Sequence, residues 1–212
     1  MILQIKNLCV NREAKIVLEN ISFQVEKKSI LTIIGESGVG KSTLLKTLNG
    51  LIPLSKGTIY YQNNDINTLN LIEYRKDVCY IPQIPVELSD TIIEEFKLIK
   101  PEIAKEEISG FLKSFKLNDN ILKRNMKTLS IGEQLRFSII RGLLNSPAVM
   151  LLDEPTSALD EDNISLLKKI ILRLNTEKDM TFIIVTHNLD MAKQITTECF
   201  QLTNKSIRKI KI

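Results

Sequence analysis

The segment that most constrains this chain is a glycine-rich loop between a strand-like and a helix-like stretch. Residues 29–34 form an apolar, β-branched run typical of a buried strand, and residues 42–48 have the pattern of a helix. Between them the pattern G-x-x-x-x-G-K-S consists of Gly35, Glu36, Ser37, Gly38, Val39, Gly40, Lys41 and Ser42, and Thr43 follows it. In this context, backbone N–H groups and a helix N-terminus surround phosphates. We therefore expect a nucleoside triphosphate site, with Lys41 at the β- and γ-phosphates and Ser42 on Mg²⁺.

Size and composition favour an ordinary globular protein. The chain has 212 residues, of which 43% are hydrophobic and 25% charged, and this fits a single large domain. The net charge is only +4 and no dense basic stripe is present, so we expect no nucleic-acid partner.

Zinc sites and disulfides have little support in the sequence. Cys9, Cys79 and Cys199 lie far apart and His187 is the only histidine, which argues against a zinc site and against disulfides and suits a reducing cytosol.

No run approaches 18 apolar residues, and the N-terminus lacks the features of a signal peptide. We therefore expect any membrane-spanning part to belong to a separate chain.

Strand-like and helix-like segments alternate along much of the sequence. Such alternation, with continuously apolar strands, predicts a parallel sheet with helices on both faces. Ligands of these sheets bind at the carboxyl ends of the strands. The apolar runs at 30–34, 78–81, 148–152 and 181–185 end, respectively, in the glycine loop, Gln83, Asp153-Glu154 and His187. We expect these four groups to converge on one nucleotide.

The remaining segments predict two further kinds of structure. Residues 1–30 and 57–61 read as antiparallel strands, and residues 205–211 as a terminal edge strand with solvated lysines. Helices are expected behind a Ser89 or Asp90 cap, from Pro101, and from about Ser130, with others over 161–174 and from Asn188.

The acidic pair after residues 148–152 predicts the chemistry of the site. An apolar strand that delivers Asp153 beside the glycine loop is a usual way to hold Mg²⁺, and Glu154 is placed to polarise an attacking water. A solvated acidic turn is the ordinary alternative, and the loop upstream favours the functional interpretation.

Several motifs, taken together, resemble the ABC ATPase family. Leu-Ser-Ile-Gly-Glu at 129–133 is similar to the family's Leu-Ser-Gly-Gly-Gln signature, and residues 157–160 to its D-loop. Gln83 falls at the Q-loop and His187 at the switch histidine. The resemblance implies an α/β P-loop NTPase fold with a RecA-like parallel core, an antiparallel β subdomain and a helical subdomain. On this basis the chain is one ABC ATPase domain, with the β subdomain at about 1–30 and 57–66, the ATP-binding core at 31–56, 67–83 and 146–212, and the helical subdomain at 84–145.

The resemblance also implies a division of labour between two copies. Members of this family dimerise head to tail around ATP, so Ser130 and the N–H of Gly132 would contact the γ-phosphate held by the partner, with Asp160 in the D-loop. In cis, the implied catalytic residues are Glu154, His187 and Gln83, and the implied Mg²⁺ ligands are Ser42, Gln83 and Asp153.

Two positions depart from the family pattern. Ile131 stands where a glycine is usual, and its branched side chain is expected to crowd the contact with the partner's nucleotide. Arg12 stands near the position of the usual adenine-stacking aromatic, and its guanidinium can stack on a base.

A finer resemblance concerns the middle of the chain. Residues 67–69, 74–75, 89–91 and 129–133 are similar to a group of bacterial ATPases that pair with a permease assigned to iron export. The leading hypothesis is a cytoplasmic ATPase, peripheral on the inner face of a bacterial membrane, that powers a separate permease. The alternative is a non-transport ABC ATPase, acting as a membrane-associated regulator or on nucleic acid or ribosomes. The chain has no heptad run and no second cassette, which disfavours the nucleic-acid and ribosome classes.

Overall fold

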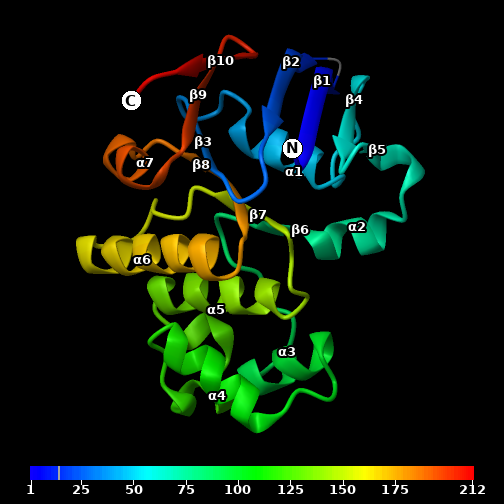
Figure 1. The fold of residues 1–212 in the computed structure, drawn as a ribbon. Helices are drawn as coiled ribbons and strands as arrows, with labels where there is room; N and C mark the ends of the chain where they lie inside the picture. Colours follow the sequence, from blue (N-terminus) through cyan, green and yellow to red (C-terminus); the bar gives the residue numbers. More distant parts are fainter. Residues whose placement is uncertain (14) are drawn as a thin grey trace.

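The computed structural model describes residues 1–13 and 15–212 and contains two sheets with helices packed around them (Figure 1). The larger sheet has the order β10 (Ser206–Ile210), β9 (Glu198–Thr203), β3 (Ile30–Ile34), β8 (Thr181–Thr186), β7 (Val149–Asp153) and β6 (Val78–Ile81). All of its pairs are parallel except that of β10 with β9. The expected parallel sheet is therefore present, with an antiparallel strand at one edge.

The smaller sheet is antiparallel throughout. Its order is β2 (Lys15–Val25), β1 (Leu3–Arg12), β4 (Lys56–Tyr61) and β5 (Asn64–Asp65). Its apolar residues share one core with α1 (Lys41–Leu48) and with one face of the larger sheet. The glycine loop, which precedes α1, therefore lies next to the smaller sheet.

Helices cover the opposite face of the larger sheet. The elements concerned are α3 (Ile92–Ile99), α4 (Lys105–Ser114), α5 (Ile131–Leu143), α6 (Glu161–Glu177) and α7 (Leu189–Ile195). Figure 1 shows α5 and α6 beneath the sheet and α3 and α4 beyond α5. The remaining helices are α2 (Leu71–Asp77) and the 3₁₀ turns η1 (Ile66–Thr68), η2 (Asp119–Lys123) and η3 (Met126–Thr128).

Strand β8 shows how the larger sheet is enclosed on both of its faces. All six of its residues are buried. Phe182 and Ile184 pack in the core with α5 and α6, whereas Ile183 and Val185 pack in the core with α1. Because successive strand residues point to opposite faces, a strand covered on both sides is continuously apolar.

Two predicted helix starts are wrong. The first helix begins at Ile92, and its N-cap is Thr91 rather than Ser89 or Asp90, because Thr91 and Glu94 form a capping box. The second helix begins at Lys105 rather than at Pro101. Residues 101–102 instead belong to a turn closed by the Ile103 N–H donating to the Lys100 carbonyl.

Other local predictions are confirmed. Ser130 is the N-cap of α5, and β10 is an edge strand in which Lys209 is exposed and pairs with Glu198 at 2.7 Å. Among the described residues, no helix combines the length and apolar character needed to cross a bilayer.

Candidate functional site

The carboxyl ends of four adjacent strands, β3, β8, β7 and β6, meet at one edge of the larger sheet. A cavity of about 510 Å³ lies there. It is lined by Ser37, Gly38, Gly40, Lys41, Ser42, Thr43, Gln83, Glu154 and His187. The structure thus brings together residues from all four strand ends, as the apolar runs in the sequence predicted.

The glycine loop turns tightly against the smaller sheet before α1 begins. Gly40 has φ of 111°, and a Cβ atom there would lie 3.1 Å from Leu18 and 3.2 Å from Val17. This residue is the N-cap of α1 and provides no side-chain hydrogen bond to the helix. The first N–H groups of α1 are therefore free of a side-chain cap at the cavity, an arrangement that favours a phosphate ligand.

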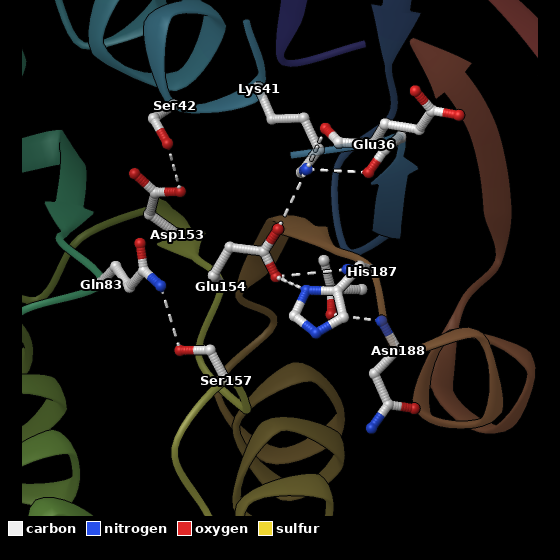
Figure 2. A network of polar contacts seen from close by, with 11 residues as sticks. Glu36, Lys41, Ser42, Gln83, Asp153, Glu154, Ser157, His187 and Asn188 are labelled. Atoms are coloured by element: carbon white, nitrogen blue, oxygen red, sulfur yellow. Dashed lines mark hydrogen bonds and ion pairs between the residues drawn. The ribbon is translucent and has the colours of Figure 1, made fainter. Parts of the chain in front are cut away.

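Lys41 lines the cavity, is buried, and joins the glycine loop to Glu154, which follows β7. Its Nζ donates to the carbonyl oxygens of Gly35 at 2.8 Å and Glu36 at 2.9 Å. The same Nζ lies 3.1 Å from Glu154 Oε1 (Figure 2). These acceptors hold the ammonium group beside the positions where phosphates would bind.

Asp153 ends β7 with both carboxylate oxygens occupied. Ser42 Oγ donates to Oδ1 at 2.9 Å, and the Tyr80 hydroxyl donates to Oδ2 at 2.7 Å. Burial, together with the hydrogen bond to Asp153 and its negative charge, raises the pKa of Tyr80, so its phenol remains a donor. Sequence reasoning missed Tyr80, because no sequence pattern links it to Asp153, which lies 73 residues further along the chain.

Glu154 turns away from Asp153 although it follows it directly. Its φ of 46° lies in the left-handed region, which non-glycine residues seldom adopt. The side chain reaches His187, where Oε2 lies 2.8 Å from Nδ1 and accepts the backbone N–H at 3.2 Å. The turn therefore gives two adjacent carboxylates separate partners and separate directions.

Gln83 lies on the opposite wall, after β6, and its Nε2 donates to Ser157 Oγ at 3.2 Å (Figure 2). Its amide oxygen, the Ser42 hydroxyl and the Asp153 carboxylate make a set of hard oxygen donors, the kind that Mg²⁺ prefers. The described residues contain no cluster of three or more His, Cys, Asp or Glu able to hold a metal by themselves. Mg²⁺ usually needs only one or two carboxylates together with substrate phosphates, so the residues present fit this ion.

Eight predicted site residues do not line this cavity. Gly35, Glu36 and Val39 belong to the glycine loop and Asp153 ends β7, whereas the other four, Ser130, Gly132, Asp160 and Arg12, belong to other elements. Arg12 is exposed at the end of β1, and Asp160 is the N-cap of α6. Ser130 donates both its N–H, at 2.8 Å, and its hydroxyl, at 3.0 Å, to Glu133 Oε2. None of the four lines the cavity built from the glycine loop of the same chain.

The starts of α5 and α6 are packed against each other. A Cβ atom at Gly132 would lie 2.8 Å from Asn163 Oδ1. Arg136 donates to this same oxygen, and Asn163 Nδ2 donates to Asp160 Oδ1 at 2.9 Å. A glycine at 132 therefore permits the close approach of the two helices.

Comparison with known proteins identifies the family. The family model described as ABC transporter matches residues 18–157. The chain belongs to the ABC transporter family. This ABC protein is 39% identical over 196 residues to the probable iron export ATP-binding protein FetA of Escherichia coli K12, covering 89% of the chain and 86% of that relative. It is 33% identical over 223 residues to the phosphonates import ATP-binding protein PhnC of Fusobacterium nucleatum, covering 97% and 90%.

Solved structures agree with this assignment. The dimeric structure of MJ0796, a bacterial ABC transporter cassette, has a TM-score of 0.87 and 27% identity, with 99% of this chain and 98% of that chain covered. A post-hydrolysis structure of the same cassette, bound to ADP and Pi, has a TM-score of 0.86 and 28% identity over similar coverage. The predicted ABC ATPase fold is confirmed, and the ABC protein is an ATP-binding ATPase subunit of a transporter.

Proposed function

We propose that this ATPase subunit works as a head-to-tail homodimer that binds and hydrolyses ATP with Mg²⁺ and drives transport through a separate integral membrane permease. The observation that carries the proposal is the position of Glu154, whose carboxylate contacts Lys41 on one side and His187 on the other. A general base beside a phosphate-binding lysine is the arrangement that hydrolysis of a γ-phosphate needs.

The proposal assigns specific roles to the charged and polar residues in and beside the cavity. Lys41 and the first N–H groups of α1 bind the β- and γ-phosphates. Glu154 accepts a proton from the attacking water, and His187 orients Glu154 through its ring nitrogen and contacts the γ-phosphate. Bound Mg²⁺ would neutralise charge on the phosphates, and the residues that would hold it are Ser42, Asp153 and Gln83.

The residues outside the cavity support a two-copy site. Ser130 and Asp160 are exposed, and neither lines the cavity beside the glycine loop of its own chain. In a head-to-tail dimer, Ser130 and the Gly132 N–H contact the γ-phosphate held by the other copy, with Asp160 nearby. The similarity to a dimeric cassette supports this assembly. Arg12, exposed at the end of β1, is the proposed stacking partner of the nucleotide base.

The segment after Gln83 supports a permease partner. Ile84, Val86 and Leu88 are 78%, 52% and 47% exposed, so three apolar side chains lie open on one short stretch. Exposed apolar groups gathered in this way indicate a protein contact. The permease would place the subunit against the inner face of a bacterial membrane.

Iron or another metal ion is the proposed cargo. This part of the proposal is supported by the similarity to the probable iron export protein FetA. The ion is the transported substrate, so we expect its binding groups to lie in the permease and not in this chain.

Purification from its own membranes tests the proposal. A tagged chain should copurify with one integral membrane protein, and vesicles containing both should move Fe²⁺ in an ATP-dependent manner. Vesicles carrying Glu154→Gln are the matched control and should show no flux. Copurification with ribosomes or DNA would contradict the transport role, and ATP hydrolysis without flux of any tested metal ion would contradict the proposed cargo.

A further inference from the structure

We propose that Tyr80 is a positioning residue for the magnesium site, because its hydroxyl fixes the Asp153 carboxylate in the orientation that faces Ser42. The inference rests on the Mg²⁺ site of the proposed function. The Tyr80 hydroxyl donates to Asp153 Oδ2, so its effect on the metal would pass through that carboxylate.

The geometry leaves the Asp153 carboxylate no free rotation. Tyr80 Oη lies 2.7 Å from Oδ2, and Ser42 Oγ lies 2.9 Å from Oδ1, so a turn of the carboxylate would break at least one hydrogen bond. Asp153 is only 3% exposed, and water therefore cannot readily replace a lost donor. Partners of this kind, which orient a metal-binding carboxylate without touching the metal, influence metal affinity strongly.

The two strands hold this contact in register. β6 and β7 are parallel neighbours, with Tyr80 opposite Leu151 and Ile81 opposite Leu152. Tyr80 also lies three residues before Gln83, which is another proposed ligand of the ion. The hydrogen bond therefore joins the strand that carries one ligand to the strand that carries another.

The hydroxyl has a role separable from that of the ring. The Tyr80 ring packs against the apolar core shared by the sheet and α1, and a phenylalanine ring would make the same contacts. Tyr80→Phe thus removes the donor to Asp153 and retains the packing. Tyr60→Phe is the matched control, because Tyr60 lies on β4 with Lys6 over its ring and is not among the residues that line the cavity.

The experiment separates metal binding from nucleotide binding in the full chain. Mn²⁺ serves as the probe, and its binding to the protein loaded with a non-hydrolysable ATP analogue is followed by electron paramagnetic resonance. Tyr80→Phe should weaken Mn²⁺ binding about tenfold, as loss of a partner of a metal ligand generally does. Binding of a fluorescent ATP analogue in EDTA should stay at the parent value, and Tyr60→Phe should change neither Mn²⁺ binding nor analogue binding.

Two results would overturn the inference. One is Mn²⁺ binding by Tyr80→Phe within about twofold of the parent, well below the usual effect of such a partner. The other is an equal loss of analogue binding in EDTA, which would show that the hydroxyl supports the glycine loop and not the metal. Failure of the proposed function is distinguishable from both, since the parent protein itself would then bind no Mn²⁺ with the nucleotide analogue.

Discussion

The Glu154 carboxylate and the His187 ring lie 2.8 Å apart, from Oε2 to Nδ1, and the same oxygen accepts the His187 backbone N–H. Two contacts from one residue fix the direction of the Glu154 side chain. Glu154 is 8% exposed, whereas His187 is exposed, so His187 holds the carboxylate from the side of the solvent. The other carboxylate oxygen, Oε1, faces Lys41.

Glu154→Gln should lower the ATPase rate by at least about 100-fold, the usual effect of losing a general base. ATP binding should persist because Lys41 keeps its contacts with the loop carbonyls. An ATP-bound dimer should then accumulate. Phosphate release measures the rate, and size exclusion with light scattering measures the dimer. Glu177→Gln, at the exposed end of α6, is the control, and hydrolysis at the parent rate by Glu154→Gln would reject Glu154 as the base.

Ile131→Gly should raise the ATPase rate if the branched side chain hinders closure on the partner's nucleotide. Ile131 is the first residue of α5 and is 52% exposed, so its removal leaves no cavity in the core. Glycine costs about 1 kcal/mol of helix stability relative to alanine, and Ile131→Ala therefore tests the same crowding with a smaller effect on the helix. Steady-state ATP hydrolysis at saturating ATP is the measurement. A rate that stays level or falls in both variants would count against crowding.

Arg141→Met should destabilise the fold by about 3–5 kcal/mol, because it leaves the buried Glu95 carboxylate without its cation. Arg141 Nη1 lies 2.6 Å from Glu95 Oε2, and the Glu95 side chain is fully buried. The double variant Arg141→Met with Glu95→Gln should recover much of the loss. Urea unfolding gives the free energies. Lys76→Met, which breaks an exposed pair with Glu73, should cost under about 1 kcal/mol, and an equally small cost at Arg141 would contradict the prediction.

Glu133→Ala should destabilise α5 in a manner that depends on pH. Burial raises the pKa of Glu133, but the hydrogen bonds from Ser130 and the positive charges of Arg124 and Arg136 together outweigh it and hold the pKa below the usual 4.5. A lowered folded pKa means that the stabilisation is present above 4.5 and is lost as the pH falls through the folded value. At neutral pH, the loss of the capping box should cost about 0.3–1.5 kcal/mol.

Urea unfolding from neutral to acidic pH measures the effect of Glu133→Ala. The difference from the parent should shrink as the pH falls below the ordinary carboxylate range. Glu106→Ala, in the first turn of α4, is the control because the N-cap of that helix makes no side-chain hydrogen bond. A difference that stays constant with pH would show that the Glu133 charge does not contribute.

The parts of the site that sequence predicted are those whose signals are local. The glycine loop, Asp153-Glu154 and His187 each follow directly after an apolar strand, and parallel pairing brings such strand ends together. By contrast, Tyr80 and Asp153 are 73 residues apart, and Arg141 and Glu95 are 46 apart. Neither pair has a sequence pattern that joins its members, so only the packing of the strands and helices reveals them.

The helix starts show a second limit of prediction from the sequence. Ser89, Asp90 and Thr91 are consecutive residues, and each has a side chain suited to capping. The Glu94 carboxylate accepts the Thr91 N–H and the Ser89 hydroxyl, which selects Thr91 as the cap. The choice among three similar candidates therefore depends on a residue further along the chain.

The contact between Gly132 and Asn163 has a mechanical consequence. Asn163 is tied to α5 through Arg136 and to the start of its own helix through Asp160, and its side chain leaves no space for a Cβ atom at Gly132. A tilt of α5 that preserves these bonds carries Asp160 and the first turn of α6 with it. The start of α5 and the start of α6 are therefore coupled, and a displacement of one helix is transmitted to the other.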